Sequence, residues 1–514
     1  MFTPTRRGAI LGLAAGAAVA CSPRDADLQG LLRVSLDSMP DSLDPLRGQF
    51  ASSALLFKQL HAPLTEYSPS GGLAPGLAVT WRSDDARVWR FTLREDLTWS
   101  DGTPLTSEDV VWTAQRAVDP STGFADLGDF FAVENARAAL RAEVAPDAIG
   151  VEAPDPRTVI FRLDQPVAMF PILMREFYPL PRHAVEAHGE DWLRPEAWVS
   201  AGPYLLEARN ALSFSLVKNP LFAAANSVMI ERIEVSVIED AAARARRFRA
   251  EDLDLADRPP TDQIGFLRGE LGDRLRGFRA PILTYLKVNC AKPHLNDARV
   301  RRALSHAIDR ARLNTQFFNG EAHPTGLVIP DRDVPAPTRD LTLAQALLSE
   351  AGFGPNNPLR ISLRATAGDR DRLAVAIMDD LSDLGVETTL IATYPNDLYQ
   401  AVDGGDYDLA LARFDRGLKS NAEFMLQPFT QDGFADNTNW TGSRRAEFNA
   451  LIDTASGELE APARLDLLRD AERVFVEEMS SIPLLHERAY WMVAPRVVLA
   501  GPAQPQLWRD LDCA

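Results

Sequence analysis

Residues 358–413 read PLRISLRATAGDRDRLAVAIMDDLSDLGVETTLIATYPNDLYQAVDGGDYDLALAR, and this stretch decides the fold class. Its apolar residues switch between a period of two, typical of strands, and the wider spacing of helices. Gly385 is placed to end the first helix. The predicted elements alternate: strand 359–363, helix 373–384, strand 386–392, helix 397–402 and strand 407–412. Such alternation indicates an α/β fold, with a parallel sheet covered by helices.

The loop that leaves the third predicted strand is the first candidate site. Ligands of such sheets bind at the carboxyl ends of the strands. That rule places at the ligand edge the loop residues Arg413, Phe414, Asp415 and Gly417. Phe414 is equally well explained as a core residue, and Asp415 as a structural ion pair with an arginine neighbour.

A second stretch, residues 86–118, predicts a strand followed by a helix. Trp89, Phe91 and Leu93 alternate with polar neighbours, as in a half-buried strand. Thr106 then begins a helix, and Asp109 stands three residues later, the spacing of a capping box.

The N-terminus has the pattern of an export signal. Arg6 and Arg7 precede an uncharged run over residues 9–20, and small residues lead to Cys21. The run is shorter than the roughly 20 residues that cross a bilayer. We predict a signal over 1–20, and Ala18 to Cys21 resembles a lipobox whose cysteine is lipidated. A buried helix or an N-terminal anchor is the alternative, and the arginine pair leaves Sec and twin-arginine export open.

Composition excludes several classes of protein. The chain has 54 Lys and Arg against 72 Asp and Glu, a net charge of −18, which disfavours a dedicated nucleic-acid binder. The three cysteines form no CxxC pair, although Cys290 and Cys513 remain free to form a disulfide. GxSxG, Walker A, GxGxxG and HExxH motifs are absent, and the seven histidines are scattered, so we predict neither an enzyme nor a metal site.

Several short motifs, taken in order, resemble family 5 of the bacterial extracellular solute-binding proteins, the oligopeptide and dipeptide receptors of ABC importers. They are LRV at 32–34, SLDP at 42–45, GLA at 76–78, WRFTLR at 89–94, WSDGTP at 99–104, GPY at 202–204, NP at 219–220 and VRRALSHAIDR at 300–310. The last contains a charge-dense group of arginines that a solvated face or interdomain ion pairs also explain.

The resemblance implies a two-lobed periplasmic-binding-protein fold of class II with an extra third domain. The expected division is lobe I at 21–70, 190–275 and 476–514, the extra domain at 71–189, and lobe II at 276–475. It further implies a periplasmic monomer without cofactor, and the lipobox-like residues predict that lipidated Cys21 alone attaches it to a membrane. Such a protein captures a peptide by lobe closure and delivers it to an ABC permease.

The resemblance also assigns roles at the ligand edge. In peptide binders an Asp after the third strand pairs with the ligand's α-ammonium; Gly417 stands at that position here, and Asp415 lies two residues earlier. Phe414 replaces a pocket Trp, and another such Trp corresponds to Pro395, beside Tyr394. Trp440 is expected to stack on a ligand or to hold a loop.

Other functions remain open at this point. Because Gly417 replaces the acidic residue, the same fold could bind a non-peptide solute such as a nickel chelate, haem, a sugar or an opine. An exported hydrolase and a signalling receptor that uses the same closure are further alternatives.

Overall fold

The computed structural model describes residues 29–68, 72–122, 132–330, 334–368, 370–415, 421–430, 438–501 and 504–513. The predicted signal, the predicted lipidation site Cys21 and the loop residue Gly417 lie outside these ranges.

The strands and helices predicted for 358–413 are confirmed, with boundaries shifted by a few residues. They are β14 (Arg360–Thr366), α12 (Asp371–Ser382), β15 (Glu387–Thr393), α13 (Pro395–Asp403) and β16 (Leu409–Asp415). β14 pairs in parallel with both β15 and β16. Gly385 has a φ of 81°, a left-handed conformation that glycine adopts without steric cost, and the chain leaves α12 there.

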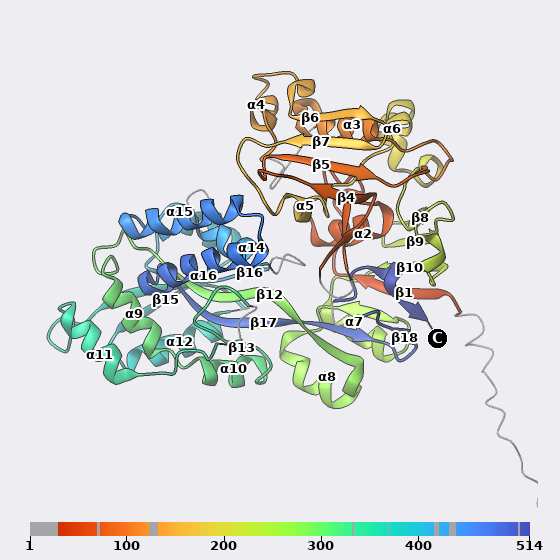
Figure 1. The fold of residues 1–514 in the computed structure, drawn as a ribbon. Helices are drawn as coiled ribbons and strands as arrows, with labels where there is room; N and C mark the ends of the chain where they lie inside the picture. Colours follow the sequence, from red (N-terminus) through yellow and green to blue (C-terminus); the bar gives the residue numbers. More distant parts are fainter. Residues whose placement is uncertain are drawn as a thin grey trace, which may run out of the picture.

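These strands belong to one long sheet that runs through the molecule in the order β15-β14-β16-β12-β17-β11-β1-β10-β9-β8. Its other members are β1 (Leu31–Leu36), β8 (Tyr204–Arg209), β9 (Ser213–Lys218), β10 (Arg232–Val237), β11 (Leu255–Asp257), β12 (Leu275–Val288) and β17 (Ser481–Val493), and β13 (His323–Pro324) pairs with β17. β1 is parallel to β10 and β11, which makes a second parallel region. The long antiparallel pair β12 and β17 joins the two regions (Figure 1).

We call the parts of the molecule on either side of this pair lobe I, which contains β1 and β8–β11, and lobe II, which contains β14–β16. Lobe I carries α2 (Ala51–Leu60), α7 (Ala241–Arg249) and α8 (Ile264–Leu271). Lobe II carries α9 (Ala298–Ala307), α10 (Arg310–Phe318), α11 (Leu341–Glu350), α14 (Ala422–Leu426), α15 (Ser443–Gly457) and α16 (Ala461–Glu478). Each lobe has its own buried apolar cluster, so each packs as a separate unit.

A smaller antiparallel sheet forms the extra domain above lobe I in Figure 1. Its order is β4-β5-β7-β6, from β4 (Ala78–Arg82), β5 (Val88–Leu93), β6 (Val151–Asp155) and β7 (Thr158–Arg162). With it lie α3 (Ser107–Val118), α4 (Ala136–Leu140), α5 (Phe170–Leu173), α6 (Arg182–His188) and the hairpin β2 (Thr65–Tyr67) and β3 (Leu73–Pro75). The predicted strand at 89–93 and the capping box of Thr106 and Asp109 are confirmed.

The remaining pair, β18 (Val497–Val498) with β19 (Asp512–Cys513), closes the C-terminal end of the described chain. Cys513 packs in a lobe I cluster and Cys290 in a lobe II cluster. Both are buried free thiols, so the structure does not support a disulfide between them. Within the described ranges, no helix has the length and apolar character needed to cross a bilayer.

The arginine-rich motif at 300–310 is structural. Arg301 is buried and donates to the main-chain oxygens of Leu295, Asn296 and Glu478, which ties α9 to the end of α16. Arg310 is likewise buried and donates to the main-chain oxygens of Ser305, Thr325 and Pro483. Both guanidinium groups act within lobe II, since all of these acceptors belong to it or to β17.

Candidate ligand-binding site

The two sets of parallel strands end facing each other over the middle of β12 and β17. On the lobe I side, Asp257 at the end of β11 pairs with Trp491, which stands opposite Arg276 of β12. On the lobe II side, Asp415 at the end of β16 pairs with Ile282. Arg276 and Ile282 are six positions apart along β12, a distance of about 20 Å at the rise per residue of a strand. The carboxyl ends of both regions therefore border one interlobe space, where α/β sheets bind ligands.

The strand pair that forms the base of this space is interrupted at its centre. The register of β12 against β17 shifts between Arg279 and Leu283. Pro281 lies in this interval and has no N–H to donate to the ladder. The hydrogen bonding of the two strands is therefore interrupted where the two lobes meet, and we call this segment the hinge.

The lobe I edge carries a compact charge cluster from two neighbouring strand ends. Arg258 Nη1 donates to Asp37 Oδ2 at 2.5 Å, and its Nε lies 3.8 Å from Asp257 Oδ2. Arg258 has a φ of 46°, a left-handed conformation that costs a non-glycine residue about 1 kcal/mol or more. Its N–H donates to the main-chain oxygen of Tyr490, and its carbonyl accepts from buried Arg244. These bonds hold the strained residue at the edge of the interlobe space.

Asp257 is the most perturbed group of this cluster. Its side chain is 15% exposed, and its Oδ1 is buried with no hydrogen-bond partner among the described residues. Burial raises the pKa of Asp257 to about 6, against the lowering effect of the Arg258 charge. A carboxyl group that titrates near neutrality at the end of a parallel strand is a candidate functional group.

The lobe II edge carries a second charge cluster. Arg413 Nε donates to Glu487 Oε2 at 3.0 Å, and Arg413 Nη2 lies 3.9 Å from Asp415 Oδ2. Glu487, on β17, also accepts from the Thr284 hydroxyl on β12, so the hinge strands orient it. Burial lowers the pKa of Arg258, but the negative charges of Asp257 and Asp37 outweigh it, so the pKa is raised; Asp415 across the interlobe space adds the smallest contribution.

The structure brings some of the sequence-predicted residues to this edge and places others inside lobe II. Arg413 and Asp415 lie at the end of β16, and Tyr394, 76% exposed, follows β15 at the same sheet edge. Phe414 is 6% exposed and packs edge-to-face against Tyr285 and Phe429. That packing agrees with the core explanation of Phe414, and its role toward a ligand stays a prediction.

Trp440 is also internal. Its side chain is 3% exposed and contacts Phe448 and Phe475 of the α15–α16 pair. Its indole N–H finds no acceptor within the part of the chain that the structure describes. These contacts favour the loop-holding explanation, and its role toward a ligand stays a prediction.

Sequence reasoning missed Asp37, Asp257, Arg258 and Glu487. Asp257 and Arg258 follow Leu255 and Ala256 and precede two prolines, so the rule for strand ends would have selected them had β11 been recognised. The strand has three residues, too few for a periodicity to be visible. Glu487 follows His486, but Tyr490 stands where an HExxH motif has its second histidine, so no motif marks this residue.

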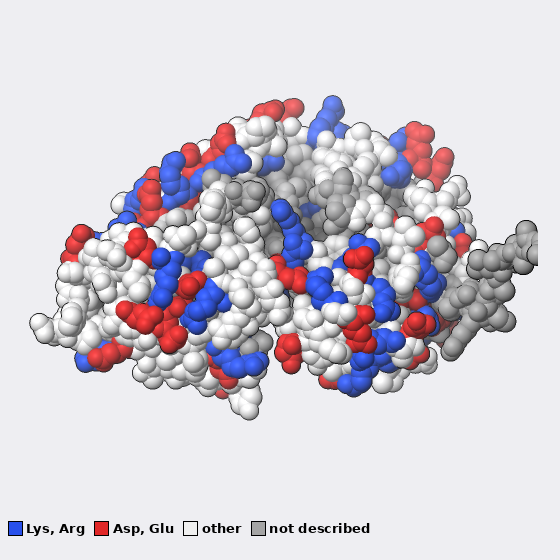
Figure 2. All heavy atoms as spheres, turned by 90° about the horizontal axis from the view of Figure 1, so that it is seen from below, with Lys and Arg blue, Asp and Glu red and all other residues white. Residues whose placement is uncertain are grey.

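Two other kinds of binding site, a metal site and a surface depression, were considered as alternatives. Among the described residues, no group of three or more His, Cys, Asp or Glu side chains is arranged to hold a metal ion. A depression of about 430 Å³ lies where the extra domain meets lobe I, lined by residues that include Arg94, Glu95, Arg157 and Leu221. Both arginines are already bonded to main-chain oxygens there, so they serve the domain's own structure. On the face that Figure 2 draws, acidic and basic side chains are interspersed and the surface is indented between the lobes.

Comparison with known proteins identifies the fold. A family model described as "Bacterial extracellular solute-binding proteins, family 5 Middle" matches residues 72–436. The chain belongs to this family. The family and the two-lobed α/β fold predicted from the sequence are therefore confirmed.

Three relatives from Escherichia coli strain K12 are similar over almost their whole length. The periplasmic murein peptide-binding protein MppA is 28% identical over 89% of this chain and 88% of its own. The probable deoxycholate-binding periplasmic protein YgiS is 28% identical, with 91% and 90% covered. The periplasmic oligopeptide-binding protein OppA is 26% identical, with 92% and 89% covered. All three are periplasmic binding proteins by name.

Two solved structures superpose on almost the whole chain. The unliganded open form of MppA superposes with a TM-score of 0.84 at 25% identity, covering 94% of this chain and 97% of its own. Haemophilus influenzae OppA in complex with the peptide RPPGFSPFR gives 0.72 at 24% identity, covering 94% and 99%. Both superpositions cover almost the whole chain, and the structure superposes well on the unliganded open form of MppA.

Proposed function

We propose that this chain captures peptides between its two lobes in the periplasm and passes them to an ABC permease, without making or breaking a covalent bond. The observation that carries the proposal is the pair of opposed strand ends over a common hinge, in a molecule similar throughout to open MppA. Ligand contacts that exist only when the lobes approach would favour the closed state. The expected division into lobe I (21–70, 190–275, 476–514), extra domain (71–189) and lobe II (276–475) is part of this proposal.

The two edge clusters are suited to the ends of an extended peptide. Asp415 is proposed to pair with the ligand's α-ammonium, because Gly417 stands at the position where peptide binders have the acidic residue. Arg258 or Arg413 is proposed to pair with a ligand carboxylate. Strand-like hydrogen bonds to the peptide main chain would supply affinity with little regard to side-chain identity. Tyr394 offers an exposed ring at the same edge, while Phe414 and Trp440 are proposed to support the edge from inside lobe II.

We also propose that the protein is attached to a membrane by a lipid on Cys21. The relatives are periplasmic by name, and the lipobox-like residues before Cys21 support a monomeric receptor held at the membrane by a lipid on that cysteine. Labelling cells with a radioactive fatty acid tests this point: label in the wild type and none in Cys21→Ala supports it, and equal labelling contradicts it.

A second candidate is a non-peptide solute. One observation favours it: YgiS, named for probable deoxycholate binding, is as similar to this chain as MppA is. Gly417 at the position of the amine-binding acid is consistent with such a ligand.

One experiment separates the two candidates. Native mass spectrometry of the purified mature protein would identify the ligand that it carries. The protein is then unfolded, freed of ligand and refolded, and two competitors are tested separately against the carried ligand: a mixture of tri- to pentapeptides, and deoxycholate. Released masses that sequence as short peptides, displaced by the peptide mixture, are the expected result. A single non-peptide mass that deoxycholate displaces and peptides do not would replace the peptide proposal with the second candidate.

A further inference from the structure

Two arginines stand directly opposite each other on the strands that join the lobes. Arg279 of β12 and Arg488 of β17 are Cα partners at the last position before the register shift. Both residues are exposed. Residues directly opposite in an antiparallel pair have Cβ atoms about 4.5–5.5 Å apart, so two like charges in these positions are destabilising. We call Arg279 and Arg488 the hinge arginines.

No carboxylate neutralises the hinge arginines within the part of the chain that the structure describes. Their one protein acceptor there is the carbonyl of Gly277, to which Arg488 Nη1 donates at 3.2 Å. A guanidinium group carries five N–H donors, so most of the donors of the two groups have no acceptor among the described residues. The chain has 72 Asp and Glu residues, and it still leaves this double positive charge unmatched.

The acidic residues next to the hinge arginines already have other partners. Glu487 precedes one of them in β17, and consecutive residues of a strand point to opposite sides. Glu487 is paired instead with Arg413 at 3.0 Å. Tyr490, two residues along the same side of β17, donates to Glu321 at 2.7 Å, and both oxygens of Glu321 also accept from Arg268 at 2.6 Å. These carboxylates are therefore occupied.

The hinge arginines lie at the centre of the connection between the lobes. Arg279 is midway along β12 between Arg276, opposite Trp491, and Ile282, opposite Asp415. Figure 2 shows basic side chains where the surface is indented between the lobes. An anion bound to both guanidinium groups would therefore bridge β12 and β17 at the point where their hydrogen bonding is interrupted.

We propose that the hinge arginines form a binding site for a phosphate group that bridges β12 and β17. The planar fork of a guanidinium group matches the oxygens of a phosphate and binds them in pairs. Two such forks a few ångströms apart favour a doubly charged oxyanion, which cancels their mutual repulsion. The site goes beyond the proposed function and does not require a peptide ligand. Free phosphate and a phospholipid headgroup supply the same chemistry.

The first test measures binding of inorganic phosphate by phosphorus NMR line broadening at constant ionic strength. Arg279→Gln and Arg488→Gln are each expected to bind phosphate at least about tenfold more weakly than the wild type, because charge-assisted hydrogen bonds are lost. Arg372→Gln is the matched control, since Arg372 is an exposed arginine of α12 with no side-chain partner among the described residues. It should bind like the wild type.

Thermal unfolding gives a second readout that a merely structural role would not produce. Without phosphate at low ionic strength, Arg279→Gln should be at least as stable as the wild type, because the repulsion is removed. In phosphate the order should reverse, since only the wild type gains binding free energy. Phosphate also stabilises proteins in general, and Arg372→Gln corrects for that effect. A variant that is less stable by the same amount in both buffers would contradict the proposal.

A third measurement distinguishes the two sources of the phosphate group. The unlipidated Cys21→Ser protein is sedimented with phosphatidylcholine vesicles that contain or lack phosphatidic acid. Sedimentation that needs phosphatidic acid and is lost in Arg279→Gln assigns the site to a lipid headgroup, and binding of inorganic phosphate alone assigns it to the free anion. If neither probe depends on Arg279 and Arg488, the proposal is wrong, whatever the outcome of the peptide experiments.

Discussion

His61 shows how the burial of one residue makes this fold sensitive to acid. Its side chain is 1% exposed, and its ring packs among Phe57, Tyr178, Trp192 and Trp198. Burial lowers the pKa of His61 to about 4, well below the usual value near 6.5. The unfolded chain therefore takes up a proton first as the pH falls.

The sign of the pH dependence follows from that order. The stability due to neutral His61 is complete above pH 6.5 and is lost as the pH falls toward 4. At pH 5 the loss from this residue is about 2 kcal/mol. His61→Phe keeps the aromatic packing and removes the titration, so its free energy of unfolding should change less between pH 7 and pH 5. Urea denaturation at both values measures this, and an unchanged difference would contradict it.

Asp415 is the residue on which the ligand assignment depends most. Asp415→Asn is expected to weaken binding of a peptide with a free α-amine by about 1.5–3 kcal/mol, because a charge-assisted hydrogen bond is lost. Calorimetric titration with a free and an N-acetylated peptide measures it, and only the free peptide should respond. Asp84→Asn, at an exposed position of the extra domain, is the matched control. Equal losses for both peptides would make Asp415 a structural residue.

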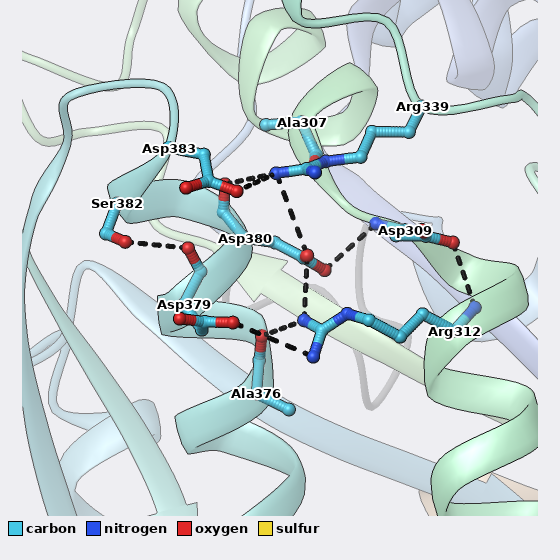
Figure 3. A network of polar contacts seen from close by, with 9 residues as sticks. All are labelled: Ala307, Asp309, Arg312, Arg339, Ala376, Asp379, Asp380, Ser382 and Asp383. Carbon is cyan, nitrogen blue, oxygen red and sulfur yellow. Dashed lines mark hydrogen bonds and ion pairs between the residues drawn. The ribbon is translucent and has the colours of Figure 1, made fainter.

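Among the elements of lobe II, α10 and α12 are connected by one buried carboxylate (Figure 3). Asp380 of α12 is 2% exposed and lies 2.7 Å from Arg312 Nη2 of α10 and 3.8 Å from Arg339 Nη2. Its other oxygen accepts from the N–H of Asp309, the residue that begins α10. One side chain thus sets the position of two helices and of the segment before α11.

Asp380→Ala should therefore destabilise the protein by about 2–3 kcal/mol, since it leaves a partly buried main-chain N–H and two guanidinium groups without this partner. Asp379→Ala is the control, because its carboxylate is 73% exposed and 3.7 Å from Arg312, where an ion pair contributes little. Thermal unfolding of the two variants distinguishes them. Similar losses in both would show that burial does not set the strength of this network.

At the scale of the whole molecule, the proposed function depends on the relative position of two lobes joined by β12 and β17. Because the register of the strands shifts around Pro281, rotation there disturbs few hydrogen bonds. Saturating peptide is expected to reduce the radius of gyration measured by small-angle X-ray scattering, and to raise the free energy of unfolding by about 2.7 kcal/mol at a hundredfold excess over Kd. Stabilisation without compaction would mean that ligand binds without closure.

The sequence by itself determined the features that depend on near neighbours in the chain. The alternating strands and helices of 358–413 follow from apolar periodicity, and the capping box of Thr106 and Asp109 follows from a three-residue spacing. Family membership was also visible, because each short motif is a local pattern. The prediction that the loop after β16 borders the ligand space needed only the general rule for parallel sheets.

Only the tertiary structure decided which distant residues meet. Asp37 and Arg258 are brought together because β1 and β11 are adjacent strands, and Glu487 reaches Arg413 because β12 lies between β16 and β17. A hydrogen bond joins Ser456 of lobe II to Pro166 of the extra domain. Sheet order and domain contacts arise from the packing of the whole chain, so the spacing of residues within one segment does not predict them. Hydrophobic periodicity arises within each helix or strand, and the sequence therefore shows it directly.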